Sequence, residues 1–439
     1  MPVTSTGRLL NVHRYRYRKG GAEAVYLDHS RLFVERGWSC AEFAMAHPKN
    51  PPSPWDEHFP SQFDPRPGWQ GLLDIPRFIY SREAKRQMGR VLETFRPDIV
   101  HVHGLYHQLT PSVLEPIAAA GIPIVYTLHD FKLLCPAYSF FTEKLGVCER
   151  CASGSYWNCA VHACLHDSRA VSAVYALDAY VHRWRGAYHG VSAFVMPSRS
   201  ILEKHLEHGF PAEKLHHIPN FFETTADEPV TPELIAEAQG CYGRYVVYFG
   251  RLSPEKGCGV LIEACDAAGL TLVLVGEGPE EARLREQAAR SSQAVHFTGY
   301  LSGERLWAVV EAALGVVLPS IWYEIAPKSV LEAMARAKPM VASAIGGLPE
   351  QIEDGVTGYL APPGDAAALS LALLRLAMLS AAEREAMGER ARIRALTSFT
   401  AERYFSSTAA LYGSFGRTAG QGGARSTRDA ASRPGRRNA

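Results

Sequence analysis

Two glutamates, Glu324 and Glu332, are separated by seven residues and have the types and spacing to bind a sugar-containing ligand. An apolar run at 315–318 predicts a buried strand; Glu324 lies in the loop after it, and Glu332 lies inside the helix that follows. Each carboxylate can accept hydrogen bonds from a pair of sugar hydroxyls, while free N–H groups at a helix start attract phosphate. The pattern therefore favours a hexose, a diphosphate and a ribose, which is the layout of a nucleotide-sugar. The alternative is that both glutamates are solvated charges near a helix start, where acidic residues are common.

Two cations lie in the loop after another predicted strand, at 245–250. Arg251 and Lys256 precede a helix start at Gly257, so they can hold fixed positive charge against a leaving diphosphate. Gly20 and Gly21 join the first strand to the first helix, and glycines there let backbone N–H groups approach an anion closely. From the residue types alone, an ordinary basic loop and a plain tight turn are the alternatives.

Three further stretches accompany the glutamate pair: GRLSPEKG at 250–257, KPMVAS at 338–343 and GGLPE at 346–350. Together they resemble family 4 of the retaining GT-B glycosyltransferases, and the resemblance covers nearly the whole chain. It implies that the Glu-x7-Glu element and the loop with Arg251 and Lys256 form the donor site, with Glu332 on the ribose. It also implies retention of anomeric configuration by front-face attack. The leaving phosphate oxygen would then take the acceptor proton, while Glu324 orients sugar hydroxyls.

The same resemblance gives roles to residues at the ends of other strands. It implies that His129, which ends the strand predicted at 122–129, bonds a donor-sugar hydroxyl or orients the incoming one. It sets the pair Gly20 and Gly21 against the donor diphosphate and the acceptor. The residues that it implies near the nucleotide base are Gly278, Tyr300 and Leu301.

Metal chemistry is not expected at this site. The chain has no Asp-x-Asp pair, which metal-dependent transferases of the other common fold use to hold a cation over the diphosphate. We therefore expect metal-independent transfer without a catalytic cofactor. We interpret His101, His103 and His107 as acceptor-pocket or core residues, because no carboxylate accompanies them at ligand spacing.

Five of the nine cysteines cluster between positions 135 and 164. In a chain of cytosolic character, thiols or metal ligands are expected rather than disulfides. Cys148 and Cys151 form a Cys-x2-Cys pair, and Cys135 and Cys164 could complete a tetrahedral structural zinc site. A set of reduced, partly buried thiols, Cys159 included, is an equally weighted alternative. Relatives with a similar histidine–aspartate and cysteine pattern belong to bacterial polysaccharide-building enzymes, as the resemblance implies.

Composition limits the class of protein. A chain of 439 residues with 47% hydrophobic residues allows two or three domains with buried cores. The net charge of +1 argues against a nucleic-acid partner. No basic-then-apolar signal segment opens the chain, and the most apolar helical stretch, at 366–382, is short for a bilayer span. We expect a cytoplasmic protein, at most peripheral to the inner face of the cell membrane.

A basic helix face raises the question of lipid. A single helix is predicted from about 72 to 95, and Arg82, Lys85, Arg86 and Arg90 fall on one face of it. Each of these cations would contribute about 1 kcal/mol of binding free energy near anionic lipid. A solvated face is the alternative. The resemblance implies a glycan or a polyprenyl-diphosphate-linked acceptor, so an anionic membrane surface is a further expected partner.

Alternating strand-like and helix-like runs position these residues and predict an α/β protein with two Rossmann-like, doubly wound domains facing across a cleft. The resemblance implies that this architecture is GT-B. The first domain is expected at 1–220, with the cysteine-rich insert at 131–170. A linker is expected at 221–243, a second domain at 244–395, and a disordered tail at 418–439. The resemblance implies that the second domain binds the donor, and that a helix at 396–417 crosses back to the first, acceptor-side domain. Strands are predicted at 8–13, 40–46, 98–103, 122–129, 193–197 and 215–219, then at 245–250, 271–275, 295–299, 315–318 and 340–343.

The residues predict a nucleotide-sugar site, and the resemblance implies a retaining hexosyltransferase of cell-surface polysaccharide biosynthesis that uses a UDP- or GDP-sugar. The loop from Glu324 reads Glu-Ile-Ala-Pro where relatives commonly have Glu-x-Phe-Gly, so their hexose contacts do not transfer directly. Two alternatives stay open. A nucleotide-sugar epimerase of the same fold would act without an acceptor, and a non-catalytic donor-binding subunit would bind the donor without releasing nucleotide.

Overall fold

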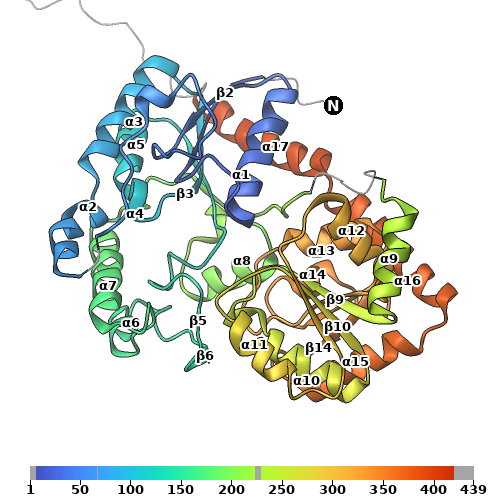
Figure 1. Ribbon diagram of the computed structural model, residues 1–439. Helices are drawn as coiled ribbons and strands as arrows, with labels where there is room; N and C mark the ends of the chain where they lie inside the picture. The colour runs from blue at the N-terminus through green and yellow to red at the C-terminus, as the bar shows by residue number, and fades with distance from the viewer. Residues whose placement is uncertain (1–5, 67, 223–228, 420–439) are drawn as a thin grey trace, which may run out of the picture.

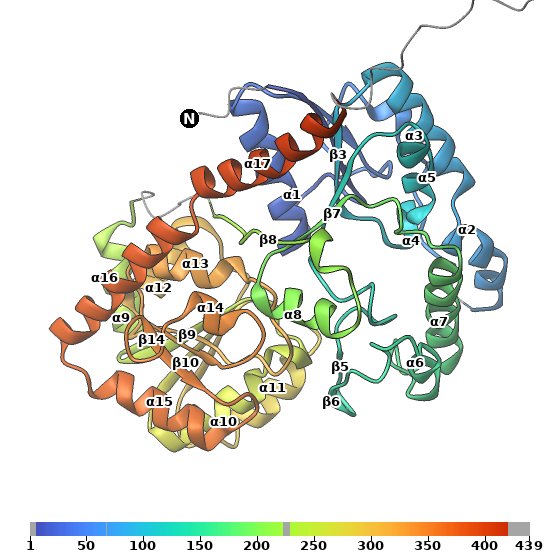
Figure 2. The same ribbon diagram turned by 180° about the vertical axis from the view of Figure 1, so that it is seen from behind.

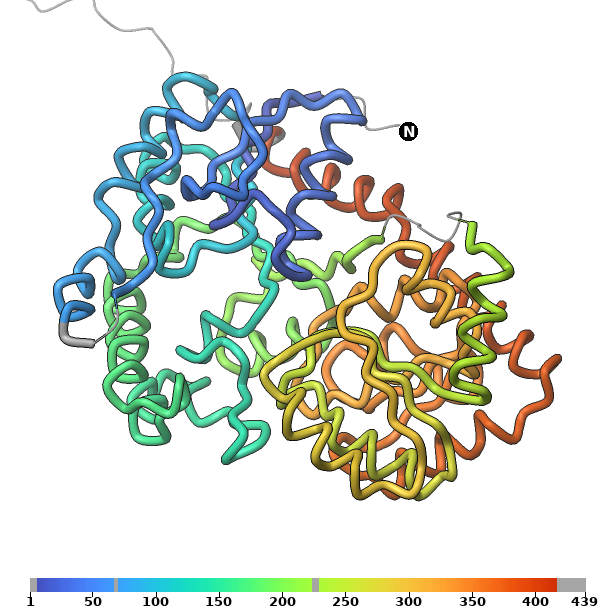
Figure 3. Tube along the Cα trace, in the orientation of Figure 1, coloured from blue at the N-terminus to red at the C-terminus, as the bar shows by residue number. Residues whose placement is uncertain are grey.

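The computed structural model describes residues 6–66, 68–222 and 229–419, which form two domains side by side (Figure 1). Each is built on a six-stranded parallel sheet, with strand orders β2-β1-β3-β4-β7-β8 and β11-β10-β9-β12-β13-β14. The strands are short, nearly continuous apolar runs, as expected for parallel sheets that helices cover on both faces. Figure 3 follows the chain from the first domain into the second.

The first sheet consists of β1 (Arg8–His13), β2 (Ser39–Phe43), β3 (Ile99–Gly104), β4 (Ile124–Thr127), β7 (Ala193–Met196) and β8 (Leu215–His217). Its longer helices are α1 (Gly21–Glu35), α3 (Arg82–Phe95), α7 (Arg169–Trp184) and α8 (Arg199–Glu207). Shorter helical pieces are η1 (Asp56–His58), η2 (Gly68–Asp74), α2 (Ile75–Ile79), α4 (Tyr106–Leu109), η3 (Pro111–Val113), α5 (Leu114–Ala119), α6 (Trp157–Val161) and η4 (Ala212–Lys214). The insert adds a small hairpin of β5 (Phe141–Thr142) and β6 (Gly146–Val147).

The second sheet consists of β9 (Tyr245–Phe249), β10 (Thr271–Val275), β11 (Val295–Gly299), β12 (Val316–Leu318), β13 (Met340–Ser343) and β14 (Gly358–Ala361). Helices surround it: α9 (Pro232–Tyr242), η5 (Pro254–Lys256), α10 (Cys258–Ala268), α11 (Glu281–Ala288), α12 (Gly303–Ala312), α13 (Lys328–Ala335), α14 (Leu348–Gln351), α15 (Ala366–Met378) and α16 (Ala381–Ser398). Its core is a single cluster of buried residues centred on β9, β10, β12 and β13.

Several sequence-based expectations are wrong in detail. The linker expected at 221–243 contains helix α9, which packs on α12; residues 223–228 lie outside the described residues. The single helix expected from about 72 to 95 is broken into η2, α2 and α3, because Ser81 caps a new helix by accepting a hydrogen bond from Ala84 N at 3.1 Å. Strand β14 was not predicted. The tail expected to be disordered lies, from residue 420 on, outside the described residues.

Helix α17 (Ala401–Ala419) leaves the second domain and lies against the first, across its back in Figure 2. Phe405 and Tyr412 of this helix pack on Phe33 of α1, with ring centroids 5.0 and 5.4 Å away. The two domains are therefore joined by the C-terminal helix as well as by the connection at 218–231.

Among the described residues, no single helix has both the length and the apolar character needed to cross a bilayer. Helix α15 and the helical run from Ala381 to Gly416 meet the length and hydropathy criteria only when they are taken together, and the chain bends by 112° between them.

Candidate functional site

Glu324 and Lys256 meet at the carboxyl end of β12. The Glu324 side chain is almost fully buried, and one of its oxygens accepts hydrogen bonds from Lys256 Nζ and Ser320 Oγ, each at 2.6 Å. Burial pushes the pKa of Glu324 upward, but the Lys256 charge and the hydrogen bonds from Lys256 and Ser320 outweigh it and hold the pKa below its ordinary value. Glu324 is thus a fixed anion. Two residues predicted for the donor site are brought together here.

The backbone around Glu324 is held by glycines. Gly347 N donates to Glu324 O at 2.7 Å. Gly346 has φ +60°, and a Cβ added there would lie 2.1 Å from the same oxygen. Only glycine fits such a position without strain. The sequence marked GGLPE as part of a motif, and the structure adds its physical reason.

Glu332 projects from α13 and is half-buried. Burial raises its pKa, although the charges of Lys328 and Arg18 oppose this. Among the described residues, none donates a hydrogen bond to Glu332. Its carboxylate therefore retains the capacity to accept hydrogen bonds from a ligand.

A buried carboxylate next to this site was missed by sequence reasoning. Asp28 of α1 accepts from Arg18 Nη2 at 2.9 Å and from Arg31 Nη2 at 3.1 Å, and its second oxygen pairs with Lys328 Nζ at the start of α13. The first domain and the donor-side helix are linked through this ion pair. No local pattern could indicate it, because Asp28 and Lys328 are 300 positions apart.

The other predicted donor residues lie in exposed or tightly packed loops. Arg251 is exposed and, among the described residues, makes no ion pair. Gly278 lies under the Arg251 loop, since a Cβ there would be 2.1 Å from Leu252 O. Tyr300 is 72% exposed after β11, and Leu301 is partly buried against the core of the second domain.

The N-terminus of α1 is open. Gly20 is its N-cap with extended backbone and no side-chain cap, and α1 begins at Gly21, around which a Cβ would meet no atom within 4 Å. Neither glycine is required by its backbone angles. Their small size leaves the first N–H groups of a 15-residue helix accessible.

His129 follows β4 and belongs to a histidine cluster. Its Nε2 lies 3.2 Å from Nδ1 of His103. Burial, with a smaller contribution from Arg14, lowers the pKa of His129 to about 4, so the ring is neutral at pH 7. His101 and His103 are buried core residues, and His101 Nε2 lies 2.7 Å from Thr127 Oγ1. His107 stacks on Phe78 with centroids 4.7 Å apart.

Two compact groups of possible metal ligands occur in the described part of the chain: His29 with His101 and His103, and Glu149 with Glu207 and His208. The sequence analysis grouped His107 with His101 and His103 as acceptor-pocket or core residues, whereas the compact group contains His29 and not His107. Both ring nitrogens of His101 already face hydroxyl groups, on Tyr412 and Thr127.

The cysteines of the insert are all free thiols. Cys135, Cys151 and Cys159 are buried, whereas Cys148 and Cys164 are partly exposed. A hydrogen bond between Cys159 and Cys164 lowers the pKa of Cys164 and raises that of Cys159. The set is close enough for the thiols to affect one another's pKa values.

The insert also contacts the Glu324 loop. Glu149, inside the Cys-x2-Cys pair, accepts a hydrogen bond of 2.6 Å from the hydroxyl of Tyr323, the residue before Glu324. Lys204 lies 3.2 Å from the same carboxylate, and the Tyr323 ring packs against Phe131 at 5.9 Å. The sequence gave no signal for this contact, which ties the insert of one domain to the site of the other.

Two family models match the chain. Residues 19–226 match "Glycosyltransferase Family 4" and residues 242–394 match "Glycosyl transferases group 1". Together the two matches cover both domains and leave out little besides the termini and the connection.

Curated relatives match over shorter stretches. The amylovoran biosynthesis glycosyltransferase AmsK of Erwinia amylovora is 36% identical over 143 residues, which are 30% of this chain and 35% of that protein. The glycogen synthase of Mycobacterium tuberculosis is 38% identical over 156 residues, 34% of this chain and 37% of that protein. The chain thus spans well under half the length of these relatives.

Solved structures match over nearly all of the chain. Anabaena HepE in complex with UDP and glucose has a TM-score of 0.63 at 22% identity, covering 93% of this chain and 100% of that one. Sucrose-phosphate synthase from Thermosynechococcus elongatus has a TM-score of 0.65 at 19% identity, covering 94% and 99%. These likenesses concern the fold, and they confirm the predicted GT-B architecture of two Rossmann-like domains.

Proposed function

Because the chain belongs to the family of glycosyltransferases that these two models describe, we propose that it transfers a hexose from a UDP- or GDP-sugar to a glycan or a polyprenyl-diphosphate-linked acceptor, with retention of configuration. The observation that carries the proposal is the buried pair of Glu324 and Lys256, which lies at the carboxyl end of β12 and one loop before α13. In open parallel sheets, ligands bind at that edge.

The two glutamates divide the donor between them. Glu324 is charged and immobile, so its free oxygen is ready to orient hydroxyls of the transferred sugar. Glu332, which no described residue supplies with a hydrogen bond, accepts from the ribose hydroxyls. Pro327 is the N-cap of α13 and provides no side-chain cap, so backbone N–H groups there are available to the diphosphate.

Positive charge for the leaving group comes from Arg251 and Lys256. Arg251 is exposed and makes no ion pair with the described residues. Lys256 Nζ donates one hydrogen bond to Glu324, and an ammonium group has further N–H groups to offer a phosphate oxygen beside that carboxylate. Fixed charge that meets developing negative charge lowers the barrier to departure. On this basis we propose transfer without a catalytic metal ion or cofactor.

Retention is proposed to proceed by attack from the face of the leaving group. Glu324 already binds Lys256 and Ser320, which suits an orienting role more than that of a free nucleophile. The leaving phosphate oxygen takes the proton of the acceptor hydroxyl. His129, neutral at pH 7, orients one hydroxyl by a single hydrogen bond.

The setting we propose is cell-surface polysaccharide biosynthesis at the cytoplasmic face of the membrane. It is supported by the relative that carries amylovoran biosynthesis in its name. In this setting the cysteine insert has a structural role. As zinc ligands, Cys135, Cys148, Cys151 and Cys164 would first have to move closer together, because no compact ligand group among the described residues contains a cysteine.

Thermal unfolding with UDP-, GDP-, ADP- and dTDP-sugars tests the donor assignment. At a hundred times Kd a bound donor should stabilise the protein by about 2.7 kcal/mol. The shift should appear for one base and vanish in Glu332→Gln, while Glu389→Gln, an exposed glutamate on α16, should keep it. Absence of a shift with every donor contradicts the proposal. Nucleotide release that requires an acceptor separates a transferase from an epimerase or a binding subunit.

A further inference from the structure

Helix α7 turns an apolar face toward solvent. Leu177, Tyr180 and Trp184 are 47%, 38% and 87% exposed, at a spacing that keeps them on one face of the helix. Ala170 and Ala173 continue the same stripe. The opposite face is the one that packs on the domain, and it buries polar residues such as Asp178 and His182. The packed face also carries apolar residues, among them Val174, Tyr175 and Ala176. Helix α7 therefore has apolar side chains on both faces, whereas an ordinary surface helix turns a polar face to water.

Neighbouring elements extend the stripe. Trp157 and Val161 of α6 are 57% and 51% exposed, and α6 packs along α7. Leu72 and Leu73 of η2 are 65% and 67% exposed, and η2 leads into α2, which also contacts α7. Figures 1 and 2 both show α2, α6 and α7 along one edge of the first domain. We call the exposed residues of η2, α6 and α7 the α6–α7 surface.

Acids and bases both lie around this surface, but two cations at its ends have no acidic partner among the described residues. Arg169 and Arg183, at the two ends of α7, are exposed and pair with no carboxylate in the described part of the chain. Arg183 also lines a cavity of about 360 Å³ together with Lys214 and with Lys132, which is paired with Asp178 at 2.9 Å in the same cavity. Asp167, an exposed acid just before α7, is paired with Lys144 at 2.6 Å.

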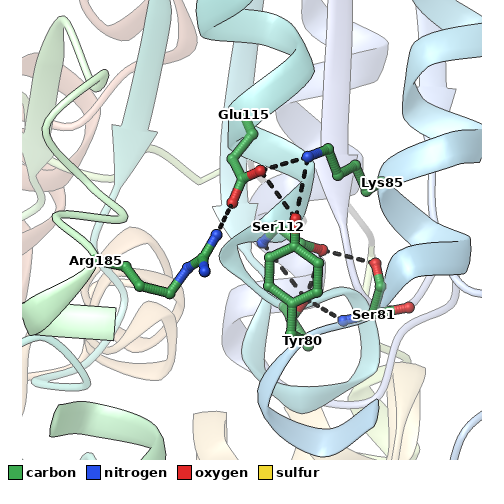
Figure 4. A network of polar contacts seen from close by, with 7 residues as sticks. Tyr80, Ser81, Lys85, Ser112, Glu115 and Arg185 are labelled. Atoms are coloured by element: carbon green, nitrogen blue, oxygen red, sulfur yellow. Dashed lines mark hydrogen bonds and ion pairs between the residues drawn. The ribbon is translucent and has the colours of Figure 1, made fainter. Parts of the chain in front are cut away.

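The basic face predicted on α3 is less available for contact with anionic lipid than the sequence suggested, because one of its cations is already paired. Glu115 binds Lys85 Nζ at 2.5 Å and Arg185 Nη2 at 2.9 Å, and the hydroxyl of Tyr80 donates to it (Figure 4). This network neutralises Lys85. It also fixes the C-terminal end of α7, because Arg185 follows the exposed Trp184.

From this arrangement we propose that the α6–α7 surface docks on an anionic lipid bilayer. Tryptophan and tyrosine favour the boundary between headgroups and acyl chains, leucine side chains enter just below it, and flanking arginines bind lipid phosphates. An apolar stripe bordered by cations without acidic partners complements such a surface. A protein partner would commonly be met by a polar rim with charged groups of both signs. The inference goes beyond the proposed transferase activity and does not depend on the donor.

Vesicle co-sedimentation tests the proposal. The full chain is mixed with vesicles of phosphatidylcholine alone or of phosphatidylcholine with about one third phosphatidylglycerol. The wild type should bind the anionic vesicles, and Trp157→Ser/Trp184→Ser should bind them at least about tenfold more weakly. The matched control is Leu371→Ser/Met378→Ser, which removes side chains 64% and 83% exposed on α15 of the second domain. All three proteins should unfold at the same temperature, because the changed side chains are exposed.

Three outcomes overturn the proposal. The first is a wild type that does not bind anionic vesicles, above all if it self-associates in solution, since the surface would then cover a second copy. The second is equal binding by wild type and the tryptophan variant. The third is loss of binding in the α15 control alone, which would move the membrane contact to the second domain.

Discussion

Replacing Lys256 by methionine removes the charge that compensates buried Glu324. Methionine keeps the length of the side chain and its contact with the Trp322 ring, over which Lys256 Nζ lies at 5.2 Å. Breaking a fully buried ion pair by removing one partner costs about 3–5 kcal/mol. The Lys256 side chain is 20% exposed, so we expect a loss of roughly 2–3 kcal/mol in the free energy of unfolding. For a domain of this size that lowers Tm by about 5–10 °C.

The loss should depend on pH with a defined sign. In the wild type the pKa of Glu324 is below the ordinary value of 4.5, so its contribution to stability is present above that pH and is lost as the pH falls. In Lys256→Met burial acts without the lysine, and the pKa of Glu324 is expected to rise above 4.5. The variant therefore loses stability as the pH rises through the new value. The difference between the two proteins should widen from about pH 5 to about pH 8, by at most about 1.4 kcal/mol per pH unit.

Urea unfolding at about pH 5 and about pH 8 measures this difference. Lys144→Met is the matched control, because Lys144 and Asp167 form an ion pair in which both side chains are mostly exposed, 65% and 77%; it should cost little at either pH. The double variant Lys256→Met/Glu324→Gln should recover part of the loss at about pH 8. A loss that is the same at both pH values, or no loss at all, would refute the account of Glu324 as a buried anion held by Lys256.

Four further predictions follow from single features. Gly346→Ala should lower the free energy of unfolding by more than about 2 kcal/mol, because its Cβ would lie 2.1 Å from Glu324 O. Gly355→Ala is the control: Gly355 also has a positive φ but has open space around it, so the same urea assay should show a loss of about 1 kcal/mol. Tyr323→Phe should lose about 1 kcal/mol, and the loss should be smaller in a Glu149→Gln background, as a double-mutant cycle can measure. Burial holds the pKa of His29 at about 3 and that of His129 at about 4. Because these rings are protonated in the unfolded chain before the folded one, the free energy of unfolding should fall as the pH drops below the ordinary pKa of 6.5. At about pH 5.5 the loss should be about 1.4 kcal/mol for each ring, as measured by urea unfolding. Transfer should persist in excess EDTA, and a rate restored only by added divalent cation would contradict metal-independent chemistry.

The sequence predicts the strands well, and it places the loop of Glu324 before helix α13, because both features are local. A buried parallel strand is a short apolar run, and β1, β9, β10, β11 and β13 lie within a residue or two of their expected positions. The order of Glu324, the α13 start and Glu332 along one segment is enough to predict that they share one edge of a sheet. Helix α9 was missed because its segment mixes threonine, proline and acids, and its burial depends on α12, some 60 positions later.

Contacts between distant segments could not be predicted, although they shape the site. Lys256 reaches Glu324 across 68 positions, and Asp28 reaches Lys328 across 300. In each case the sequence offers two ordinary charged residues, and only the fold reveals that a buried carboxylate must have a partner. The charge that the sequence assigned to the diphosphate therefore has a second role, that of holding Glu324 ionised before any donor arrives.

The hydrogen bond between Tyr323 and Glu149 couples the cysteine insert to the loop that carries Glu324. Glu149 lies between Cys148 and Cys151, so whatever fixes that pair also fixes the acceptor of the Tyr323 hydrogen bond. Tyr323 precedes Glu324, whose backbone is held on its other side by Gly346 and Gly347. A loop clamped by glycines from its own domain and by a hydroxyl bonded to the other domain has little freedom left. Loss of order in the insert should therefore be felt first at Glu324, although the cysteines belong to the other domain.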